Sequence, residues 1–501
     1  MKAQKVKIKS CQKYKKKEQF FYGKWKEIVL GIERKNRSGG TFLIMEERRK
    51  VATLTLGCKV NQYETDAVQE LLSAVGYEIV EFHDKADVYL VNTCSVTNMA
   101  DRKSRQMLHR ARKMNPEGVV IAMGCYVQSA AEELLKDPYV DLVIGNNKKK
   151  DIVTILDEYF RTNHKVQEVI DINDTEEYEE LTINEVSEHT RAYIKVQDGC
   201  NQFCSYCIIP YTRGRVRSRK MEDVLKEVES LAKNGYKEVV LTGIHLSSYG
   251  IDLREDGEEL HRKAVYGIEK SKLLELIQKV AKIEGIKRVR LGSLEPRIIT
   301  EEFATELTKI DEFCPHFHLS LQSGCDETLK RMNRHYTCEE YKESCNILRK
   351  AFDRPALTTD VIVGFPGETE EEFEQTYAYL DEINLYEMHV FKYSRRKGTR
   401  ADQMKDQIAD PIKAKRSALL LAMSSKNQKE FEDSFLGETV EILLEEAYEE
   451  EGKKYFVGHT KRYQKVAVEG DSFRENEEVL VTLTGRLSSG MLIGTRIFEE
   501  K

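Results

Sequence analysis

The sequence contains one tryptophan and eight prolines among 501 residues, and no apolar run approaches the length of a membrane span. Its N-terminus also lacks the apolar central region of a secretory signal. Without such a signal, we expect the protein in the reducing cytoplasm, where cysteines serve as metal ligands or core thiols rather than as disulfides. The positions of the eleven cysteines are therefore the most informative feature of the sequence.

Acidic residues outnumber basic ones, but the charge is unevenly distributed along the chain. The net charge is −6, whereas residues 1–44 carry 13 Lys and Arg against three Glu, so the remainder carries −16. A chain this acidic binds nucleic acid only through local basic patches. One interpretation of residues 1–44 is a disordered basic extension that contacts RNA. We favour another, in which Met45 is the true translation start, because codons for Arg37-Ser38-Gly39-Gly40 are compatible with a ribosome-binding sequence.

Three cysteines lie in one short segment with the spacing C-x3-C-x2-C: Cys200, Cys204 and Cys207. Thiolates at this spacing can bind one metal centre from a single loop. The fourth nearby cysteine that a closed zinc or iron–sulfur site needs is missing. The incomplete set leaves one coordination position for another molecule, which favours a catalytic site, and zinc is the alternative occupant.

Residues 51–160 alternate short apolar runs with amphipathic stretches, which predicts a doubly wound parallel sheet covered by helices. We expect strands at 51–56, 77–81, 87–93, 119–123 and 141–144, and helices near 61–75, 98–114, 128–136 and 151–160. Cys58, Cys94 and Cys125 each follow one of these strands. Functional sites in such sheets form outside the carboxyl ends of the strands, so the three thiols can meet at a second site. Each alone is also compatible with a small core residue.

Residues 185–425 contain six strand-like runs separated by helical patterns, which predicts a partial (β/α)6 barrel with its active site at the carboxyl ends of the strands. The Cys200 segment follows the first strand of this region. We expect strands at 192–197, 238–242, 288–294, 317–322, 357–363 and 387–393, and helices at 221–234, 272–283, 301–309, 338–351 and 370–382. The remaining cysteines of this region show no metal-binding spacing and are interpreted as core thiols; they are Cys314, Cys325, Cys338 and Cys345.

Residues 435–501 contain five short β-rich segments separated by glycines, which predicts a small antiparallel barrel similar to the OB fold. Such barrels bind nucleic acid through a basic and aromatic face. The acidic run 441–451 would repel RNA and is expected to face elsewhere. The candidate RNA-binding side chains are Lys461, Arg462, Tyr463, Lys465 and Arg486.

A C-x3-C-x2-C segment after the first strand of a six-unit β/α barrel resembles the radical S-adenosylmethionine (SAM) enzymes. In that family the three cysteines bind a [4Fe-4S] cluster, and SAM binds its fourth iron. From residue 51 to the C-terminus the chain resembles the methylthiotransferases. The resemblance implies a second [4Fe-4S] cluster on Cys58, Cys94 and Cys125, and identifies residues 435–501 as an RNA-binding TRAM domain.

Two segments resemble one branch of these methylthiotransferases. They are Gly57-Cys58-Lys59-Val60-Asn61-Gln62-Tyr63-Glu64 and Asn92-Thr93-Cys94-Ser95-Val96-Thr97-Asn98. Both are similar to the MtaB-type enzymes, which act on threonylcarbamoyladenosine beside the tRNA anticodon. The isopentenyladenosine and ribosomal-protein branches usually have other residues after the first two cysteines. The same reaction on isopentenyladenosine remains the alternative.

The resemblance also assigns SAM contacts at the strand ends. Thr242 and Gly243 would face the methionine part of SAM, Glu295 and Gln322 the ribose or methionine, and Tyr206 the adenine. For each, the alternative is a strand-terminal residue that satisfies local backbone groups. Two basic groups are candidates for binding tRNA phosphates. They are Arg213, Arg215, Arg217, Arg219 and Lys220, and Arg395, Arg396, Lys397 and Arg400.

The resemblance implies a radical reaction at carbon 2 of the modified adenine, a position unreactive in ordinary acid–base chemistry. SAM would be cleaved to a 5′-deoxyadenosyl radical, and sulfur carried at the second cluster would be transferred as a methylthio group. The implied partners are the tRNA anticodon loop, a low-potential electron donor such as flavodoxin or ferredoxin, and a sulfur donor. The competing hypothesis is a non-enzymatic iron–sulfur protein that binds RNA or transfers electrons.

Overall fold

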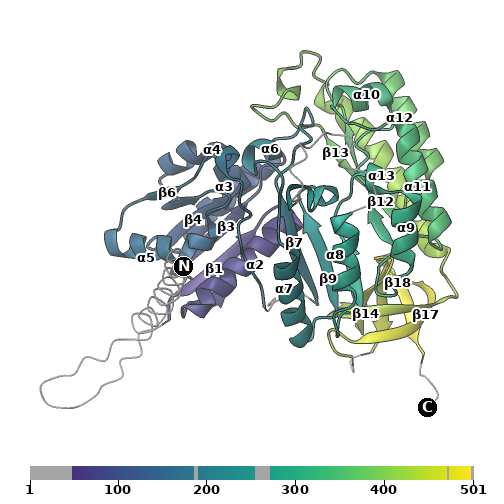
Figure 1. Cartoon of the computed structure of the whole chain (residues 1–501), viewed down its shortest axis with the longest axis horizontal. Coiled ribbons are helices and arrows are strands. Elements are labelled where there is room, and N and C mark those ends of the chain that lie inside the picture. The colour runs from purple at the N-terminus through teal and green to yellow at the C-terminus, as the bar shows by residue number, and fades with distance from the viewer. Residues whose placement is uncertain (1–47, 185–189, 254–270, 471–472, 498–501) are drawn as a thin grey trace, which may run out of the picture. The chain divides into compact units, whose positions relative to one another are not determined.

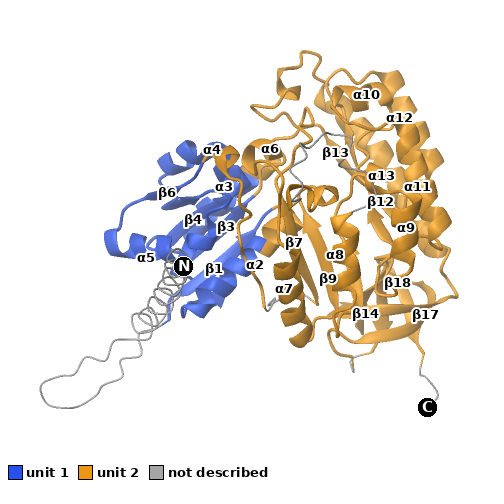
Figure 2. Cartoon of the chain, in the orientation of Figure 1, with its two compact units in different colours: residues 1–56, 64–93, 102–170 blue, residues 57–63, 94–101, 171–501 orange. Residues whose placement is uncertain are grey.

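The structure is a computed structural model that describes residues 48–184, 190–253, 271–470 and 473–497 (Figure 1). The basic extension 1–44 lies outside the described residues. The chain divides into two compact units (Figure 2). The first ends near Ile170 and excludes two short segments, residues 57–63 and 94–101, which belong to the second unit with all residues from Asp171 onward. Among the described helices, none combines the length and apolar content of a membrane span.

The first unit is built on a six-stranded parallel sheet in the order β2-β1-β3-β4-β5-β6. The five predicted strands are present, and the three-residue β6 was not predicted. The strands are β1 (Lys50–Thr55), β2 (Glu78–Val80), β3 (Val88–Thr93), β4 (Val119–Gly124), β5 (Leu142–Ile144) and β6 (Val166–Glu168). The helices are α2 (Lys59–Ala74), α3 (Asn98–Met114), α4 (Cys125–Lys136) and α5 (Ile152–Thr162).

The central strands of this sheet are buried along their whole length, because helices cover both faces of a doubly wound sheet. β3 and β4 contain the continuous apolar runs that this burial requires, and every residue of both strands is buried. Leu90, Ile121 and Leu142 pack in one core cluster on neighbouring strands. Each such side chain contributes about 1.5–3 kcal/mol to folding when fully buried.

The second unit begins with six parallel strands that form the predicted partial barrel. Four strands pair in the order β10-β9-β7-β8, with β8 antiparallel at the edge, and three pair in the order β11-β12-β13. Isolated parallel bridges from Val289 to Phe313 and from Leu294 to Leu319 connect the two sheets. The strands are β7 (Arg191–Asp198), β8 (Arg217–Ser218), β9 (Glu238–Gly243), β10 (Arg288–Leu291), β11 (His316–His318), β12 (Ala356–Val363) and β13 (Glu387–Lys392).

The helices around this barrel follow the predicted pattern, and α11 has the predicted bounds, Cys338–Ala351. Capping boxes fix the starts of α11 and α12: Thr337 with Glu340, and Thr369 with Glu372. The described helices of this region are α6 (Ile209–Thr212), α7 (Met221–Lys233), α8 (Lys272–Val280), α9 (Glu301–Thr308), α10 (Asp326–Arg331), α11, α12 (Glu370–Ile383) and α13 (Asp410–Asp433).

Two parts of this region differ from the prediction. β11 ends at His318 rather than continuing to Gln322, whose left-handed backbone (φ 78°) is incompatible with a strand. The long helix α13 was not predicted. Its buried side includes polar residues such as Arg416, Ser424 and Asn427, so the apolar periodicity that marks an amphipathic helix is missing.

The C-terminal strands form a closed barrel in the order β14-β15-β16-β18-β17. The expected barrel is present, but it is not wholly antiparallel, because β16 and β18 pair in parallel. A Cβ atom at Gly458 would lie 2.0 Å from the carbonyl oxygen of Leu443, so only glycine fits where β15 crosses β14. The strands are β14 (Thr439–Glu450), β15 (Lys453–Thr460), β16 (Lys465–Glu469), β17 (Glu478–Arg486) and β18 (Leu492–Arg496).

The C-terminal barrel packs against the amino ends of the central strands. Arg288 Nη2 donates to Glu441 Oε1 (3.0 Å), and Arg191 pairs with Glu445. The Tyr463 ring stacks on that of His316, with the ring centroids 5.0 Å apart. This packing closes the amino end of the central barrel and leaves its carboxyl end as the place for a site.

The same interface contradicts part of the RNA-face prediction for the C-terminal barrel. Lys461 donates to the carbonyl oxygen of Asp311, Arg462 to that of Asp353, and Arg486 pairs with Glu432. Together with Tyr463, these side chains bind the central region, so the prediction that they face RNA is wrong. The sequence pattern of the strands predicts which side chains point outward from the small barrel, but not which part of the protein they contact. Lys465 pairs with Glu446 on the surface.

Candidate functional site

The Cys200 segment leaves the carboxyl end of β7 as a tight loop. Gly199 has a φ of 70°, and a Cβ atom there would lie 1.8 Å from the carbonyl oxygen of Arg215, so glycine is required. Phe203 is also left-handed (φ 50°), which is uncommon for an aromatic residue. The N–H of Cys207 donates to the carbonyl oxygen of Cys204 (3.0 Å). These constraints turn the backbone sharply between the three cysteines.

Residues that follow α10 hold this loop in place. Asn333 Nδ2 donates to the carbonyl oxygens of Gln202 (3.3 Å) and Phe203 (3.0 Å). Ser205 Oγ donates to the carbonyl oxygen of Arg331 (2.8 Å), and its N–H donates to that of Met332 (2.9 Å). The loop therefore has a fixed shape before any metal binds, as a preorganised site requires.

Arg334 was not identified from the sequence, yet it lies directly beside the cysteine loop. Its Nη1 donates to Cys204 Sγ (3.3 Å), Nη2 to the carbonyl oxygen of Ser320 (3.1 Å) and Nε to the Tyr336 hydroxyl (2.9 Å). These three bonds hold the Arg334 guanidinium against the sulfur of Cys204. No local motif marks Arg334, because it lies 130 residues from its cysteine partner.

The protonation of the cysteine thiols bears on what they can bind. Burial raises the pKa of Cys200 to about 12, and burial together with the neighbouring Cys204 raises the pKa of Cys207 further. Metal ligands must lose their protons, so a metal centre that binds here displaces the proton of each thiol. Three thiols on one preorganised loop fit the [4Fe-4S] group that the resemblance implies.

The residues predicted to contact SAM lie at or beyond the carboxyl ends of the strands. Thr242 and Gly243 end β9, and the N–H of Glu295 donates to Ser247 Oγ (2.9 Å). Gln322 donates its N–H to the carbonyl oxygen of Asp360 (2.9 Å). Tyr206 packs edge-on against Phe365, in an apolar cluster beside the cysteine loop. These placements agree with the predicted region, and the individual SAM contacts remain predictions.

His245, just beyond β9, is a further polar group at this end of the barrel. Its N–H donates to Gln197 Oε1 (2.7 Å), and its Nδ1 lies 2.6 Å from Ser248 Oγ. Burial, with the positive charges of Arg334 and Arg297, lowers the pKa of His245 to about 3. The imidazole is therefore neutral at physiological pH. The sequence analysis assigned it no role.

The second set of cysteines follows three neighbouring strands of the first sheet. Thr55 pairs with Asn92, and Thr93 pairs with Gly124, so the ends of β1, β3 and β4 are adjacent. Cys58, Cys94 and Cys125 follow these ends by three, one and one residues. The cysteines thus follow the strand ends where they were predicted. Their binding of one common cluster remains a prediction, since Cys125 belongs to the first unit and the other two to the second.

Several arginines predicted to bind tRNA phosphates have structural partners instead. Arg213 pairs with Asp198 (3.1 Å) and Arg219 with Glu227, and both are buried. Arg396 donates to Ser95 Oγ (2.7 Å) and pairs with Asp101 (2.7 Å), anchoring the segment after Cys94. Arg217 is buried as well. The tRNA prediction is wrong for these four, since alternation of charge does not reveal burial. The exposed members are Arg215, Lys220, Arg395, Lys397 and Arg400.

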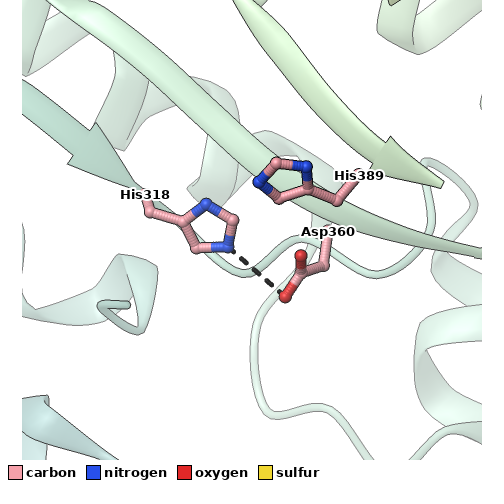
Figure 3. A group of neighbouring side chains, drawn as sticks. All are labelled: His318, Asp360 and His389. Atoms are coloured by element: carbon pink, nitrogen blue, oxygen red, sulfur yellow. Dashed lines mark ion pairs between the residues drawn. The ribbon is translucent and has the colours of Figure 1, made fainter. Parts of the chain in front are cut away.

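Three side chains on β11, β12 and β13 form a polar group that the sequence analysis missed (Figure 3). One ligand atom each from His318, Asp360 and His389 lies within 4.8 Å of the others. His318 Nε2 lies 3.3 Å from Asp360 Oδ2, and its Nδ1 lies 2.9 Å from Thr358 Oγ1. Two imidazoles and one carboxylate can bind a divalent metal or form hydrogen bonds to an organic ligand.

Two family models match the chain, one in the central region and one in the N-terminal region. The radical SAM superfamily matches residues 194–380, and the uncharacterized protein family UPF0004 matches residues 50–145. The solved structure of the radical S-adenosylmethionine methyltransferase TsrM from Kitasatospora setae superposes with a TM-score of 0.52 at 14% identity, covering 71% of this chain and 74% of that one. At this identity the likeness shows a shared fold.

Curated relatives cover most of the chain. The threonylcarbamoyladenosine tRNA methylthiotransferase MtaB of Bacillus subtilis is 43% identical, covering 84% of this chain and 90% of that protein. The corresponding enzyme of Aquifex aeolicus is 40% identical, covering 79% and 92%. A tRNA-2-methylthio-N6-dimethylallyladenosine synthase of Clostridium tetani is 33% identical, covering 83% and 88%.

Proposed function

Because the chain belongs to the family of radical SAM tRNA methylthiotransferases, we propose that it adds a methylthio group to carbon 2 of threonylcarbamoyladenosine next to the anticodon. One observation carries this choice of nucleoside. Identity reaches 43% and 40% with two relatives named for threonylcarbamoyladenosine, against 33% with one named for dimethylallyladenosine, at similar coverage. The sequences around Cys58 and Cys94, which resemble those of the MtaB-type enzymes, support the same choice of nucleoside.

As a family member, the protein is a transferase that uses SAM and two [4Fe-4S] clusters. We assign the first cluster to Cys200, Cys204 and Cys207, and the second to Cys58, Cys94 and Cys125. When bound, the first cluster supplies the electron that cleaves SAM to methionine and a 5′-deoxyadenosyl radical. Arg334 holds the sulfur of Cys204, while the loop fixed by Asn333 keeps the three ligands in place.

We further propose that five residues at the strand ends hold SAM. Thr242 and Gly243 would orient its methionine part, and Glu295 and Gln322 would bind its ribose or methionine groups. Tyr206 would pack beside the adenine, since it belongs to an apolar cluster next to the cysteine ligands.

The remaining parts of the proposal concern partners. We infer that residues 435–501 serve as a TRAM-type RNA-binding module, since the strand order of the closed barrel is that of a small Greek-key barrel. The electron would come from a low-potential carrier such as flavodoxin or ferredoxin, and a separate donor would restore the sulfur. We place the reaction in the cytoplasm, where the tRNA anticodon loop and reduced carriers are both present.

The test uses the reconstituted enzyme with reductant, SAM and tRNA that contains threonylcarbamoyladenosine. We expect 5′-deoxyadenosine and the methylthiolated nucleoside, both measured by mass spectrometry of the reaction and of the digested tRNA. Absence of 5′-deoxyadenosine would support the competing non-enzymatic iron–sulfur protein. Methylthiolation of isopentenyladenosine tRNA alone would overturn the choice of nucleoside while leaving the reaction type intact.

A further inference from the structure

His318, Asp360 and His389 lie on the inner, concave face of the central barrel, which is called the lumen face below. Side chains alternate across a strand, and the neighbouring residues Phe317, Val361 and Met388 are buried on the opposite face. Ile362, two residues after Asp360 on β12 and therefore on the same face, packs in the cluster that contains Tyr206 of the cysteine loop. The lumen face therefore carries the polar group.

This polar group is open to a ligand. The exposed fraction of the side chain is 12% for His318, 29% for Asp360 and 48% for His389. Asp360 and His389 are paired across β12 and β13, and the two imidazole rings stack with centroids 5.6 Å apart. The Asp360 carbonyl oxygen accepts from the N–H of Gln322, a residue proposed to bind SAM. The group thus borders the proposed reaction site.

The three side chains offer both kinds of hydrogen-bonding group. The Asp360 carboxylate accepts, while imidazole N–H groups donate. His318 is oriented by Thr358 on one side and by Asp360 on the other, whereas Nδ1 of His389 lies 3.8 Å from a carboxylate oxygen of Glu387. One carboxylate with an adjacent donor matches a ligand that carries hydroxyl, N–H and carboxylate groups together.

The two candidate nucleosides differ in the hydrogen-bonding groups of their N6 substituents. A threonylcarbamoyl substituent carries an ureido N–H, a hydroxyl and a carboxylate, whereas an isopentenyl substituent is wholly apolar. An apolar group placed against Asp360 and His389 would remove their water and return no hydrogen bond. Sites built to hydrogen-bond a substrate group discriminate strongly against analogues that lack it.

We propose that His318, Asp360 and His389 form the binding site for the polar N6 substituent of the substrate adenosine. This inference rests on the proposed function, since it names the groups by which the same site selects its nucleoside. Asp360 accepts from the hydroxyl or ureido N–H of the substituent. His389 donates to its carboxylate, and His318 holds Asp360 in position.

The experiment compares two 17-nucleotide anticodon stem-loops, one with threonylcarbamoyladenosine and one with isopentenyladenosine, on the reconstituted holoenzyme. For each variant, kcat/KM for methylthiolation is measured for both RNAs, together with cluster iron and the visible absorbance band of the protein. The variants are His389→Leu, His389→Gln and Asp360→Asn. His164→Leu is the control, since His164 is an exposed residue of the first unit.

We expect His389→Leu and Asp360→Asn to lower the preference for the threonylcarbamoyl RNA by about ten- to a hundred-fold, as loss of a hydrogen bond to a charged group predicts. His389→Gln should retain part of the preference, because its amide still donates. His164→Leu should behave as the wild type. Cluster iron and the visible absorbance band of His389→Leu should match those of the wild type, which shows that the variant is folded and holds its clusters.

Two results would overturn the inference while leaving the proposed function intact. The first is an unchanged preference in both His389→Leu and Asp360→Asn, with the wild type active on the threonylcarbamoyl RNA. The second is a tightly bound metal, beyond cluster iron, that is present in the wild type and absent from His389→Leu; the group would then be a metal site. A wild type that modifies only the isopentenyl RNA would overturn both the inference and the proposed nucleoside.

Discussion

At the scale of single residues, the site depends on side chains and backbone angles that serve one loop. Gly199 and Phe203 shape the loop, and Asn333 and Arg334 hold it from a distant part of the chain. The cysteines themselves were identified from their spacing. Their supporting residues were not, because a hydrogen bond across 130 residues leaves no local pattern. Side chains that support a site are as necessary as its ligands.

The two sets of cysteines should be separable by mutation. Cys204→Ala removes a proposed ligand of the SAM-cleaving cluster, so 5′-deoxyadenosine formation should stop. Cys58→Ala leaves this loop intact and should retain cleavage while methylthiolation ends. Both products are measured in the same reaction by mass spectrometry. Equal loss of cleavage in the two variants would contradict this division of roles.

Gly199→Ala should prevent the first cluster from assembling, because the new Cβ would collide with the carbonyl oxygen of Arg215. The matched control is Gly235→Ala, a left-handed glycine with no atom within 4 Å of its Cβ position. The control should lose only about 1 kcal/mol of stability from backbone strain. Cluster iron and the visible absorbance band measure the outcome. Full cluster content in Gly199→Ala would show that the loop can rearrange.

At the scale of elements, the starts of helices and the apolar strands could be predicted from the sequence. Elements that bury polar side chains could not. The bounds of α11 were predicted because Thr337 and Glu340 form a recognisable cap before an amphipathic run. α13 was missed because it buries Lys413, Arg416 and Ser424. Arg416 pairs with the buried Glu368 (2.8 Å), so tertiary ion pairing, not apolar periodicity, explains its buried face.

Thr337→Ala should destabilise the protein by about 1 kcal/mol, the usual cost of removing an N-cap side chain. Thr369→Ala removes the equivalent cap of α12 and should have a similar effect. The two caps belong to separate helices and share no partner, so the effects should add in the double variant. Denaturant unfolding followed by circular dichroism measures each change. A double variant that loses no more than either single one would indicate coupling between the helices.

At the scale of the whole molecule, a buried ionic network joins the C-terminal barrel to the central one. Glu238, at the start of β9, lies 3.0 Å from Arg290 and 3.6 Å from Arg191. Arg290 Nη1 also donates to the carbonyl oxygen of Lys461 (3.0 Å), so the network reaches the C-terminal barrel. Burial alone would raise the pKa of Glu238, but Arg290 and Arg191 outweigh it and lower the pKa to about 2.

This lowered pKa predicts a pH-dependent contribution to stability. A carboxyl group whose folded pKa is depressed stabilises the fold above its unfolded pKa, and loses that contribution as pH falls toward the folded value. Glu238 should therefore contribute fully above the ordinary pKa of 4.5 and lose its contribution as the pH falls toward about 2. Thermal unfolding between pH 7 and pH 2 measures this dependence.

Glu238→Gln isolates the contribution of this residue from that of other carboxylates. At pH 7 the variant should be less stable by about 3–5 kcal/mol, because three buried arginines lose their shared partner. The difference from the wild type should shrink as the pH falls below about 4.5. A difference that stays constant down to pH 2 would show that Glu238 is not ionised in the folded protein.

The order of the folds and the proposed cysteine ligands could be predicted from the sequence, because both depend on local spacing and periodicity, and the type of reaction followed from the family resemblance. Cysteine spacing, alternating apolar runs and helix caps act over a few residues and can be seen without a structure. Only the tertiary structure shows which charged side chains are exposed and which are buried in contacts within the protein. Arg213 and Arg396 looked like RNA contacts and are buried, and Tyr463 stacks on His316. His318, Asp360 and His389 come together from three strands. Burial and convergence depend on contacts between distant segments, which only the folded chain defines.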